Sequence, residues 1–399
     1  MWNYFKIELM QFFLSKKNFA VYVVFMMGIV FFSFRLAPDY DPIEKIDEEE
    51  IQARYDSRNA FLAESQFSSN PMVYYARSIF ETINPLDGER LRALKEEDWA
   101  TYAAKTASWY EETNWITQGS SDFFYNPRYY SYGNAFAEMD GFYGYSAASV
   151  TMHAYAEADY ALSRNVLDGR TAWQTLERLW MNYLPYILLA TGLFLIVDII
   201  TKDRHNPTVL RGFPIANWKR MVVKMGVAYM GVAALWLPIM IGFLFVGLQF
   251  GFGSLHMPVT TYELLPKDEM IHHFSTMTLR QFFTQVLFLH FLWVSALIGL
   301  VFLVSVLVYQ EMLTIVLGLL FIFAEFIYFS RAAGKLWDVQ QLPFTYSQVG
   351  QIVTGMRKFY YETPLVEYAT GCYLVGGCAI VAFAFTFLCM LNRRFALIR

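Results

Sequence analysis

Six long apolar stretches, almost free of charged side chains, constrain this chain more than any other feature of its sequence. A helix needs about 20 mostly apolar residues to cross the hydrocarbon core of a bilayer, and each stretch approaches or exceeds that length. The sequence therefore predicts an all-α membrane protein with six transmembrane helices. The stretches are residues 18–34, 179–197, 225–251, 281–308, 312–329 and 368–391.

The composition supports this interpretation. Apolar residues make up 56% of the chain and charged residues 17%, whereas soluble domains average about 45–50% and 25%. So much apolar surface excludes a disordered chain. A secreted domain held by disulfides is also excluded, because the three cysteines all lie within the last stretch, at Cys372, Cys378 and Cys389.

Basic residues near the ends of the spans predict the orientation. The side shared by both termini carries three lysines before the first span, six basic residues between the second and third, and three arginines in the tail. The short loops of the other side carry six. Because lysine and arginine accumulate on the cytoplasmic side, we expect both termini to be cytoplasmic.

A large acidic segment, residues 36–175, separates the first two spans and is expected to face outward. Residues 37–170 hold 23 acidic and 11 basic side chains, a net charge of −12, while the rest of the chain carries +8. The segment has no cysteine and no Asn-x-Ser/Thr acceptor site. These absences favour a bacterial plasma-membrane protein over a eukaryotic one.

Within this segment, apolar spacing predicts helices over residues 42–67 and 91–115, with a break at Asp87-Gly88. Residues 119–144 are rich in tyrosine, phenylalanine and glycine and are expected to be irregular. Two interpretations of the aromatic region stay open. Its rings pack on the domain or the membrane interface, which we favour, or they form a surface for an amphipathic peptide or a lipid.

Two ionisable residues lie inside predicted spans. Glu325 is either a functional group, a partner of an external arginine such as Arg331, or a side chain that reaches the interface. For His290, an interhelical hydrogen bond is favoured over a proton relay. These two residues are the candidate intramembrane polar sites.

No catalytic or metal-binding motif is present. The sequence contains no phosphate-binding Gly-x-x-x-x-Gly-Lys-Ser/Thr, no His-Glu-x-x-His and no Gly-x-Ser-x-Gly. We therefore expect no enzymatic activity, cofactor or metal in this chain, and nothing indicates a nucleic-acid partner.

The segment between the second and third spans carries the most informative pattern. Asp198–Arg204 continues the second span, and Thr208–Arg211 can form a short helix that Gly212 ends. Pro214 then fixes a turn, and Asn217 can cap the helix of the third span. By itself this could be an ordinary positively charged loop.

The pattern resembles the membrane subunit of bacterial type-2 ABC export permeases, in which a charged stretch, a short coupling helix and a Gly-x-Pro-like turn follow the second span. Residues 7–17 are similar to the amphipathic elbow helix that opens such permeases, and Leu342–Tyr346 and Gly376-Gly377 are similar to their last outer segment and last span. The positions that match the coupling region are Lys202, Asp203, Arg204, Arg211, Gly212, Phe213, Pro214 and Trp218.

This resemblance implies a transport subunit without its own ATPase. A separate cytosolic ABC ATPase, holding ATP and Mg²⁺, would dock on the coupling residues, and a second copy or a related permease would complete the pathway. The exported molecule would be a peptide, a lipid-like molecule or an antimicrobial compound. The alternative is a membrane sensor or immunity protein that binds an external peptide. A third hypothesis, an intramembrane enzyme, would need ionisable residues that face each other.

The predicted organisation divides the chain into alternating spans and connections. The elbow helix is 1–17 and the mostly helical extracellular domain is 36–175. The spans are 18–35, 176–200, 221–250, 281–308, 312–329 and 368–391. The connections are the coupling segment 201–220, the external loop 251–280, the external or re-entrant segment 330–367 and the cytoplasmic tail 392–399.

Overall fold

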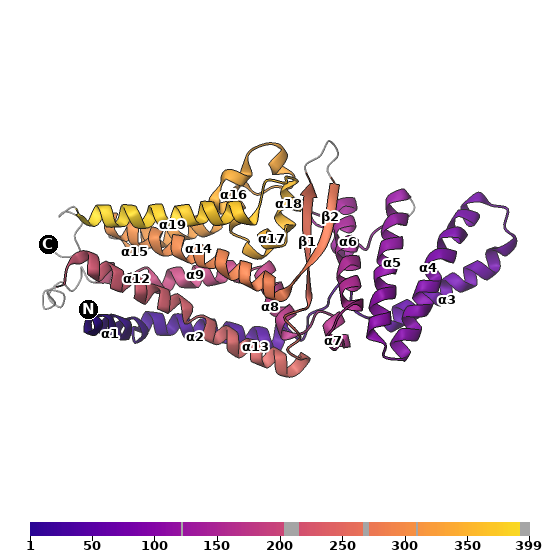
Figure 1. Cartoon of the computed structure of the whole chain (residues 1–399), viewed down its shortest axis with the longest axis horizontal. Coiled ribbons are helices and arrows are strands. Elements are labelled where there is room, and N and C mark those ends of the chain that lie inside the picture. The colour runs from indigo at the N-terminus through magenta and orange to yellow at the C-terminus, as the bar shows by residue number, and fades with distance from the viewer. Residues whose placement is uncertain (121–122, 203–214, 266–270, 309, 392–399) are drawn as a thin grey trace.

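The computed structural model describes residues 1–120, 123–202, 215–265, 271–308 and 310–391. The molecule is elongated and mostly helical (Figure 1). One half is a bundle of long apolar helices, α2, α9, α12–α15 and α19, which we call the apolar bundle. The other half is the helical domain, formed by α3–α6, which extends from one end of the bundle.

Within the described residues, four helices of the apolar bundle are long and apolar enough to cross a membrane, which is compatible with a membrane protein. They coincide with the first, third, fourth and sixth predicted spans. They are Lys16–Leu36, which comprises α2 (Lys16–Phe31) and a short π-helix; Asn217–Phe250, which comprises α12 (Asn217–Ala233) and α13 (Trp236–Phe250); α14 (Leu279–Leu307); and α19 (Tyr368–Leu391).

The second and fifth predicted spans do not correspond to single helices of this length. The second corresponds to α9 (Leu184–Ile196), which is bent by 71° from the preceding helical segment that ends with α8 (Ala172–Met181). Pro185 lies at the start of α9 and suits the first turn of a helix better than its interior. The fifth corresponds to α15 (Glu311–Phe323), whose 13 residues extend about 20 Å and fall short of the roughly 30 Å hydrocarbon core. The six-span layout therefore stays a prediction.

A proline interrupts the third predicted span. Pro238 has no N–H to donate to the carbonyl of Ala234, four residues earlier. The N–H of Leu237 donates to that carbonyl instead, over 3.1 Å, and the helix is divided there into α12 and α13.

The helical domain stacks four helices, each packed against the next. The side chains of Asp47, Asn70 and Asp98 accept hydrogen bonds from the first turns of α3, α4 and α5, so each begins with a standard N-cap. The helices are α3 (Glu48–Glu64), α4 (Pro71–Lys95), α5 (Trp99–Gly119) and α6 (Ala137–Ala156).

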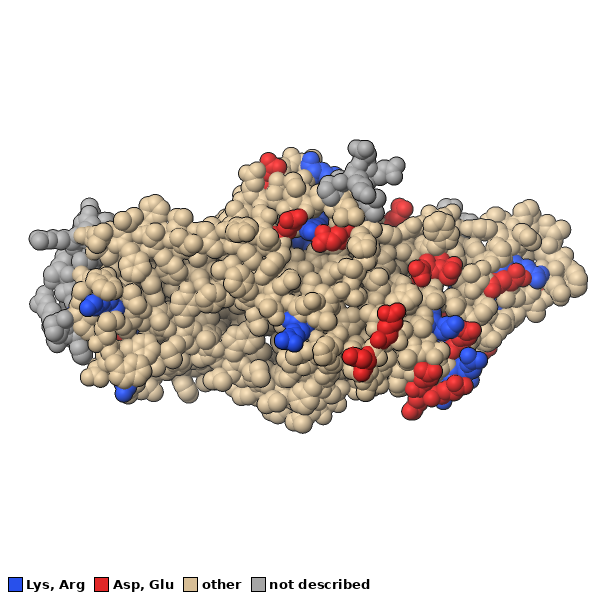
Figure 2. Space-filling view, viewed as in Figure 1, with Lys and Arg blue, Asp and Glu red and all other residues tan. Residues whose placement is uncertain are grey.

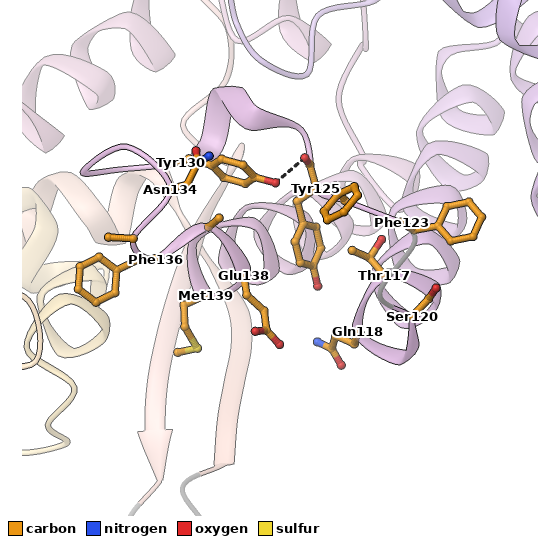
Figure 3. A pocket seen from close by; sticks show the side chains of 13 residues that line it. Thr117, Gln118, Ser120, Phe123, Tyr125, Tyr130, Asn134, Phe136, Glu138 and Met139 are labelled. Carbon is orange, nitrogen blue, oxygen red and sulfur yellow. Dashed lines mark hydrogen bonds between the residues drawn. The ribbon is translucent and has the colours of Figure 1, made fainter.

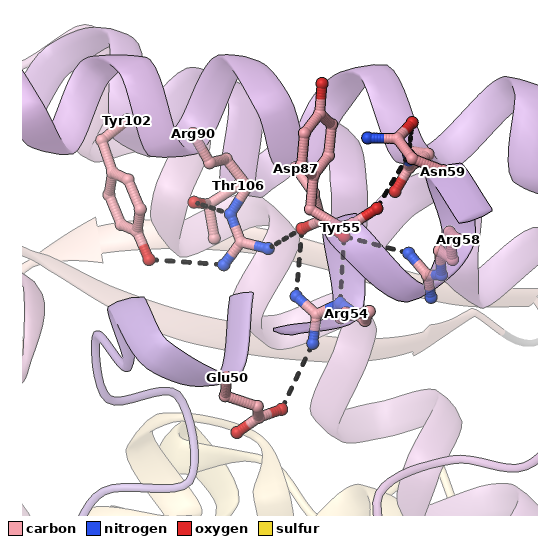
Figure 4. A network of polar contacts seen from close by, with 10 residues as sticks. Glu50, Arg54, Tyr55, Arg58, Asn59, Asp87, Arg90, Tyr102 and Thr106 are labelled. Atoms are coloured by element: carbon pink, nitrogen blue, oxygen red, sulfur yellow. Dashed lines mark hydrogen bonds and ion pairs between the residues drawn. The ribbon is translucent and has the colours of Figure 1, made fainter. Parts of the chain in front are cut away.

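The predicted break at Asp87-Gly88 is wrong, because α4 continues through it. Asp87 is fully buried, and its carboxylate accepts hydrogen bonds from Arg54, Arg58 and Arg90 over 2.8–3.0 Å (Figure 4). Two of these arginines come from α3, so the ion pairs fasten α3 to α4. The tertiary contacts of Asp87 thus outweigh the local turn preference of Asp-Gly.

The aromatic region is irregular only in part. Residues 123–136 hold no long helix, but α6 begins at Ala137 and includes Gly141 and Gly144. A Cβ atom at Gly141 would lie 2.2 Å from the ring of Tyr125, and one at Gly144 would lie 2.2 Å from the ring of Tyr129. The glycines therefore admit tyrosine rings onto the helix, and the favoured interpretation, rings packed on the domain, holds for these two tyrosines.

A β-hairpin departs from the predicted all-α fold. Residues 251–280, predicted as a loop, include the antiparallel strands β1 (Pro258–Leu265) and β2 (Ile271–Thr278). In β1, Val259, Tyr262 and Leu264 are buried, and such β-branched and aromatic residues favour strands. The hairpin packs against α6 and against α18, so it lies between the helical domain and the bundle. The short helices of this region are α7 (Arg164–Leu167), α16 (Glu325–Tyr328), α17 (Val349–Val353) and α18 (Met356–Tyr361).

Candidate functional site

A cluster of buried charges lies where the first helix meets the apolar bundle. The Nζ atom of Lys224, on α12, lies 3.1 Å from each carboxylate oxygen of Glu8. Lys224 is fully buried and Glu8 is 2% exposed. Glu8 belongs to α1 (Trp2–Phe13), which packs along α12. The pair therefore fastens the N-terminal helix to the start of the third predicted span.

The same cluster includes the end of the second predicted span. The Nζ of Lys224 donates to the carbonyl of Ile199 over 2.9 Å, and the Nζ of Lys202 lies 3.2 Å from Oε2 of Glu8. Lys17, at the start of α2, pairs with Asp198. We call these five charged residues, Glu8, Lys17, Asp198, Lys202 and Lys224, the basal junction.

The buried ions of the basal junction, Glu8 and Lys224, need close partners of opposite charge or hydrogen-bonding partners. Moving a carboxylate and an ammonium out of water is costly, and the cost is offset only when the ions are paired and hydrogen-bonded. Glu8 meets this condition with two lysines, and Lys224 meets it with a carboxylate and a carbonyl. In the part of the chain that the structure describes, the junction links α1, α12 and the end of the second span into one unit.

Of the residues predicted to couple to an ATPase, only Lys202 and Trp218 are described. Lys202 belongs to the basal junction, and Trp218 is 55% exposed at the start of α12. The other six, Asp203, Arg204, Arg211, Gly212, Phe213 and Pro214, lie outside the described residues.

Sequence reasoning did not single out Glu8 or Lys224 as a pair. Lys224 was counted only as one positive charge among several on its side of the membrane. The available signal was a lone acidic residue in a mostly apolar helix, WNYFKIELMQFF, and a lysine one turn or two inside a span. A pairing across 216 residues cannot be read from either.

Glu325 forms a buried network, but with a different partner from the one considered. It is 1% exposed, and Oε2 lies 3.1 Å from Nη2 of Arg357. The same carboxylate accepts hydrogen bonds from the hydroxyls of Ser347, Tyr361 and Tyr186 over 2.8–3.1 Å. The suggested pairing with Arg331 is wrong, because Arg331 pairs with Asp140. The network ties α9 and α16 to the chain that precedes α19.

His290 does not make the favoured interhelical hydrogen bond at Nδ1. That atom is buried without a hydrogen-bond partner among the described residues. Its ring packs edge-on against Trp180, with 5.0 Å between centroids. No hydrogen bond or ion pair links His290 to Glu325 in the described parts of the chain, so the facing pair that an intramembrane enzyme would need is not formed there.

Charge is distributed unevenly over the surface. In Figure 2, acidic side chains gather over the helical domain and the adjoining region, whereas the apolar bundle presents few charges on this face. The two halves of the molecule thus offer different environments, one suited to water and one suited to lipid.

The sequence matches no protein-family model, no curated protein and no solved structure.

Proposed function

We propose that this chain is the membrane subunit of an ATP-driven exporter. In this proposal the chain crosses a bacterial plasma membrane six times with both termini in the cytoplasm, and the helical domain faces outward. A separate cytosolic ATPase binds the segment 201–220 and powers transport. A second copy of the chain, or a related permease, completes the pathway.

The observation that carries the proposal is the basal junction. Force applied by a cytosolic partner to residues 201–220 must reach the spans on either side of that segment. Lys202 lies at the start of the segment and Lys224 follows its end, and both bind Glu8. Because the junction holds these elements together through the buried Glu8–Lys224 pair and the partly exposed Lys202 beside it, we infer that they move as one body rather than independently.

The distribution of charge supports the proposed orientation. The helical domain region, residues 37–170, carries a net charge of −12, and the remainder of the chain carries +8. Lysines and arginines accumulate near the predicted cytoplasmic ends of the spans. α1 and the C-terminal end of α19 lie at the same end of the apolar bundle, opposite the helical domain (Figure 1).

Co-purification from the native host tests the proposal. The tagged chain, extracted in mild detergent, should recover a cytosolic ATPase. Changing Phe213 and Trp218 together to alanine should remove the ATPase, because aromatic residues often anchor protein interfaces, and Trp218 is exposed. Trp115→Ala is the matched control, since Trp115 is 77% exposed but lies in the helical domain.

Each outcome decides between the two main hypotheses. Loss of the ATPase from the double variant but not from Trp115→Ala supports transport and locates the coupling site. If no ATPase accompanies the wild-type chain, the exporter is refuted, and a sensor or immunity protein that binds an external ligand becomes the better hypothesis.

A further inference from the structure

The helical domain contains a pocket with a volume of about 520 Å³. It lies between the C-terminal end of α5, residues 123–125 and the first turn of α6 (Figure 3). Sites for small molecules usually measure about 300–1,000 Å³. The pocket is therefore large enough for a small ligand or for one or two side chains of a peptide.

Aromatic rings provide most of the apolar wall of this pocket. Phe123, Phe124, Tyr125, Tyr130 and Phe136 line it. Phe124 is 79% exposed, so its ring is accessible without any rearrangement of the core. Aromatic faces attract cations because the ring quadrupole is negative above its plane, and the attraction is strongest where several rings meet.

Among the described residues that line the pocket, Glu138 supplies the single charged group. It lies in the first turn of α6, is exposed, and makes no hydrogen bond or ion pair with another described residue. No lysine or arginine is among the described residues that line the pocket. The described part of the wall therefore combines several rings with one negative charge.

Tyr125 holds the inner wall in place. It is 3% exposed, its hydroxyl donates to Oδ1 of Asn114 over 2.7 Å, and its carbonyl accepts from the hydroxyl of Tyr130 over 2.8 Å. Burial raises the pKa of Tyr125 to about 12; a hydrogen bond with Gln118 opposes this rise, and the nearby charge of Glu138 adds to it. The phenol thus stays neutral at ordinary pH, and Glu138 remains the one charge among the described lining residues.

We propose that this pocket binds an organic cation with an aromatic body, the rings contacting the body and Glu138 pairing with the positive charge. The net charge of −12 in the surrounding region would draw such a cation toward the pocket. The inference deepens the proposed function, because it names the class of molecule that the outer domain would receive. Binding itself needs no ATPase.

Direct binding to the full-length chain in lipid nanodiscs tests the proposal. The probes are 2-naphthylmethyl-trimethylammonium and 2-naphthylmethanesulfonate, which share an aromatic body and carry opposite charges. Isothermal titration, with empty nanodiscs subtracted, should give saturable binding of the cation. The anion should bind at least about tenfold more weakly, because like charges repel across the site.

Two pairs of variants locate the site. Glu138→Gln should weaken binding of the cation by about threefold to fivefold, whereas Glu157→Gln, exposed at the other end of α6, should leave it unchanged. Phe124→Ala should weaken binding by about twofold to fivefold. Phe67→Ala is its control, because Phe67 is 91% exposed beyond the end of α3.

Three results would overturn the proposal: no saturable binding of the cation, equal binding of both probes, or equal effects of each variant and its control. Equal binding of both probes would point to a site for neutral or lipid-like molecules. None of these results bears on the ATPase, so the pocket and the exporter can fail separately.

Discussion

The Nη1 atom of Arg331 lies 3.0 Å from Oδ1 of Asp140, and both side chains are buried. Asp140 belongs to α6 of the helical domain, whereas Arg331 belongs to the chain between α16 and α17. The rings of Phe136, Phe359 and Tyr360 surround the guanidinium at 4.7–4.9 Å. This contact therefore connects the helical domain to the segment that also holds Glu325 in its network.

Replacing Arg331 with methionine should weaken the attachment of the helical domain. Removing one partner of a buried pair leaves the other without compensation and costs about 3–5 kcal/mol. Hydrogen exchange of the amides of α6 and α18 should report faster local opening. Lys335→Met is the control, because Lys335 pairs with Glu362 near the surface and should cost at most about 1 kcal/mol. Equal effects would contradict the role of the buried contact.

The basal junction should depend on charge rather than on side-chain volume. Lys224→Met removes the buried one of the two lysines that pair with Glu8 while keeping a long side chain, and it should destabilise the docking of α1 by about 3 kcal/mol or more. Exchange of the α1 amides would measure this loss. Lys6→Met, exposed on the same helix, should have little effect.

A second variant separates a lost ion pair from a packing defect at this junction. Replacing both Glu8 and Lys224 with methionine removes both buried charges, and Lys202, which is partly exposed, can turn toward water. The double variant should therefore be more stable than Lys224→Met alone. If the double variant loses as much stability as Glu8→Met and Lys224→Met combined, the result would contradict the electrostatic explanation.

Asp87 should be essential to the helical domain. Asp87→Asn leaves Arg54, Arg58 and Arg90 without their shared carboxylate, and we expect a loss of about 3–5 kcal/mol. Exchange of the amides where α4 meets α3 and α5 would measure it. Asp56→Asn is the control, because Asp56 is exposed and, among the described residues, accepts only from Gln52. Near-equal stability of the two variants would show that the arginines find other partners.

Glu44 should make the stability of the helical domain dependent on pH. Burial raises its pKa above the ordinary 4.5, although the Tyr129 hydroxyl and the charge of Arg128 oppose the rise. The folded state therefore binds this proton more tightly than the unfolded state does. Stability should fall as pH increases from about 4.5 through the raised pKa, and then stay constant.

Glu44→Gln should remove this contribution. The amide oxygen of glutamine can still accept from Tyr129, so the difference in unfolding free energy between wild type and variant should grow across the same pH range, in favour of the variant. Equilibrium unfolding at a series of pH values would measure it. Parallel profiles for the two proteins would contradict the prediction.

Much of the architecture was predictable because it depends on local properties of the chain. Apolar stretches of sufficient length mark helices wherever they occur, and four of the six predicted spans coincide with long apolar helices. Pro238 interrupts the third predicted span between α12 and α13, because its ring nitrogen cannot donate a hydrogen bond. The hairpin at residues 258–278 was missed because the segment between two spans was read as a connection, although its β-branched and aromatic residues favoured strands.

What the sequence determined by itself is the division into apolar and acidic parts, because hydrophobicity and charge are properties of single residues and of their local spacing. Only the tertiary structure decided which charges meet. Glu8 and Lys224 lie 216 positions apart in the sequence. Glu325 pairs with Arg357, whereas Arg331 pairs with Asp140. A buried charge requires a partner, but the partner is chosen by how helices pack, and that choice depends on contacts distributed over the whole chain.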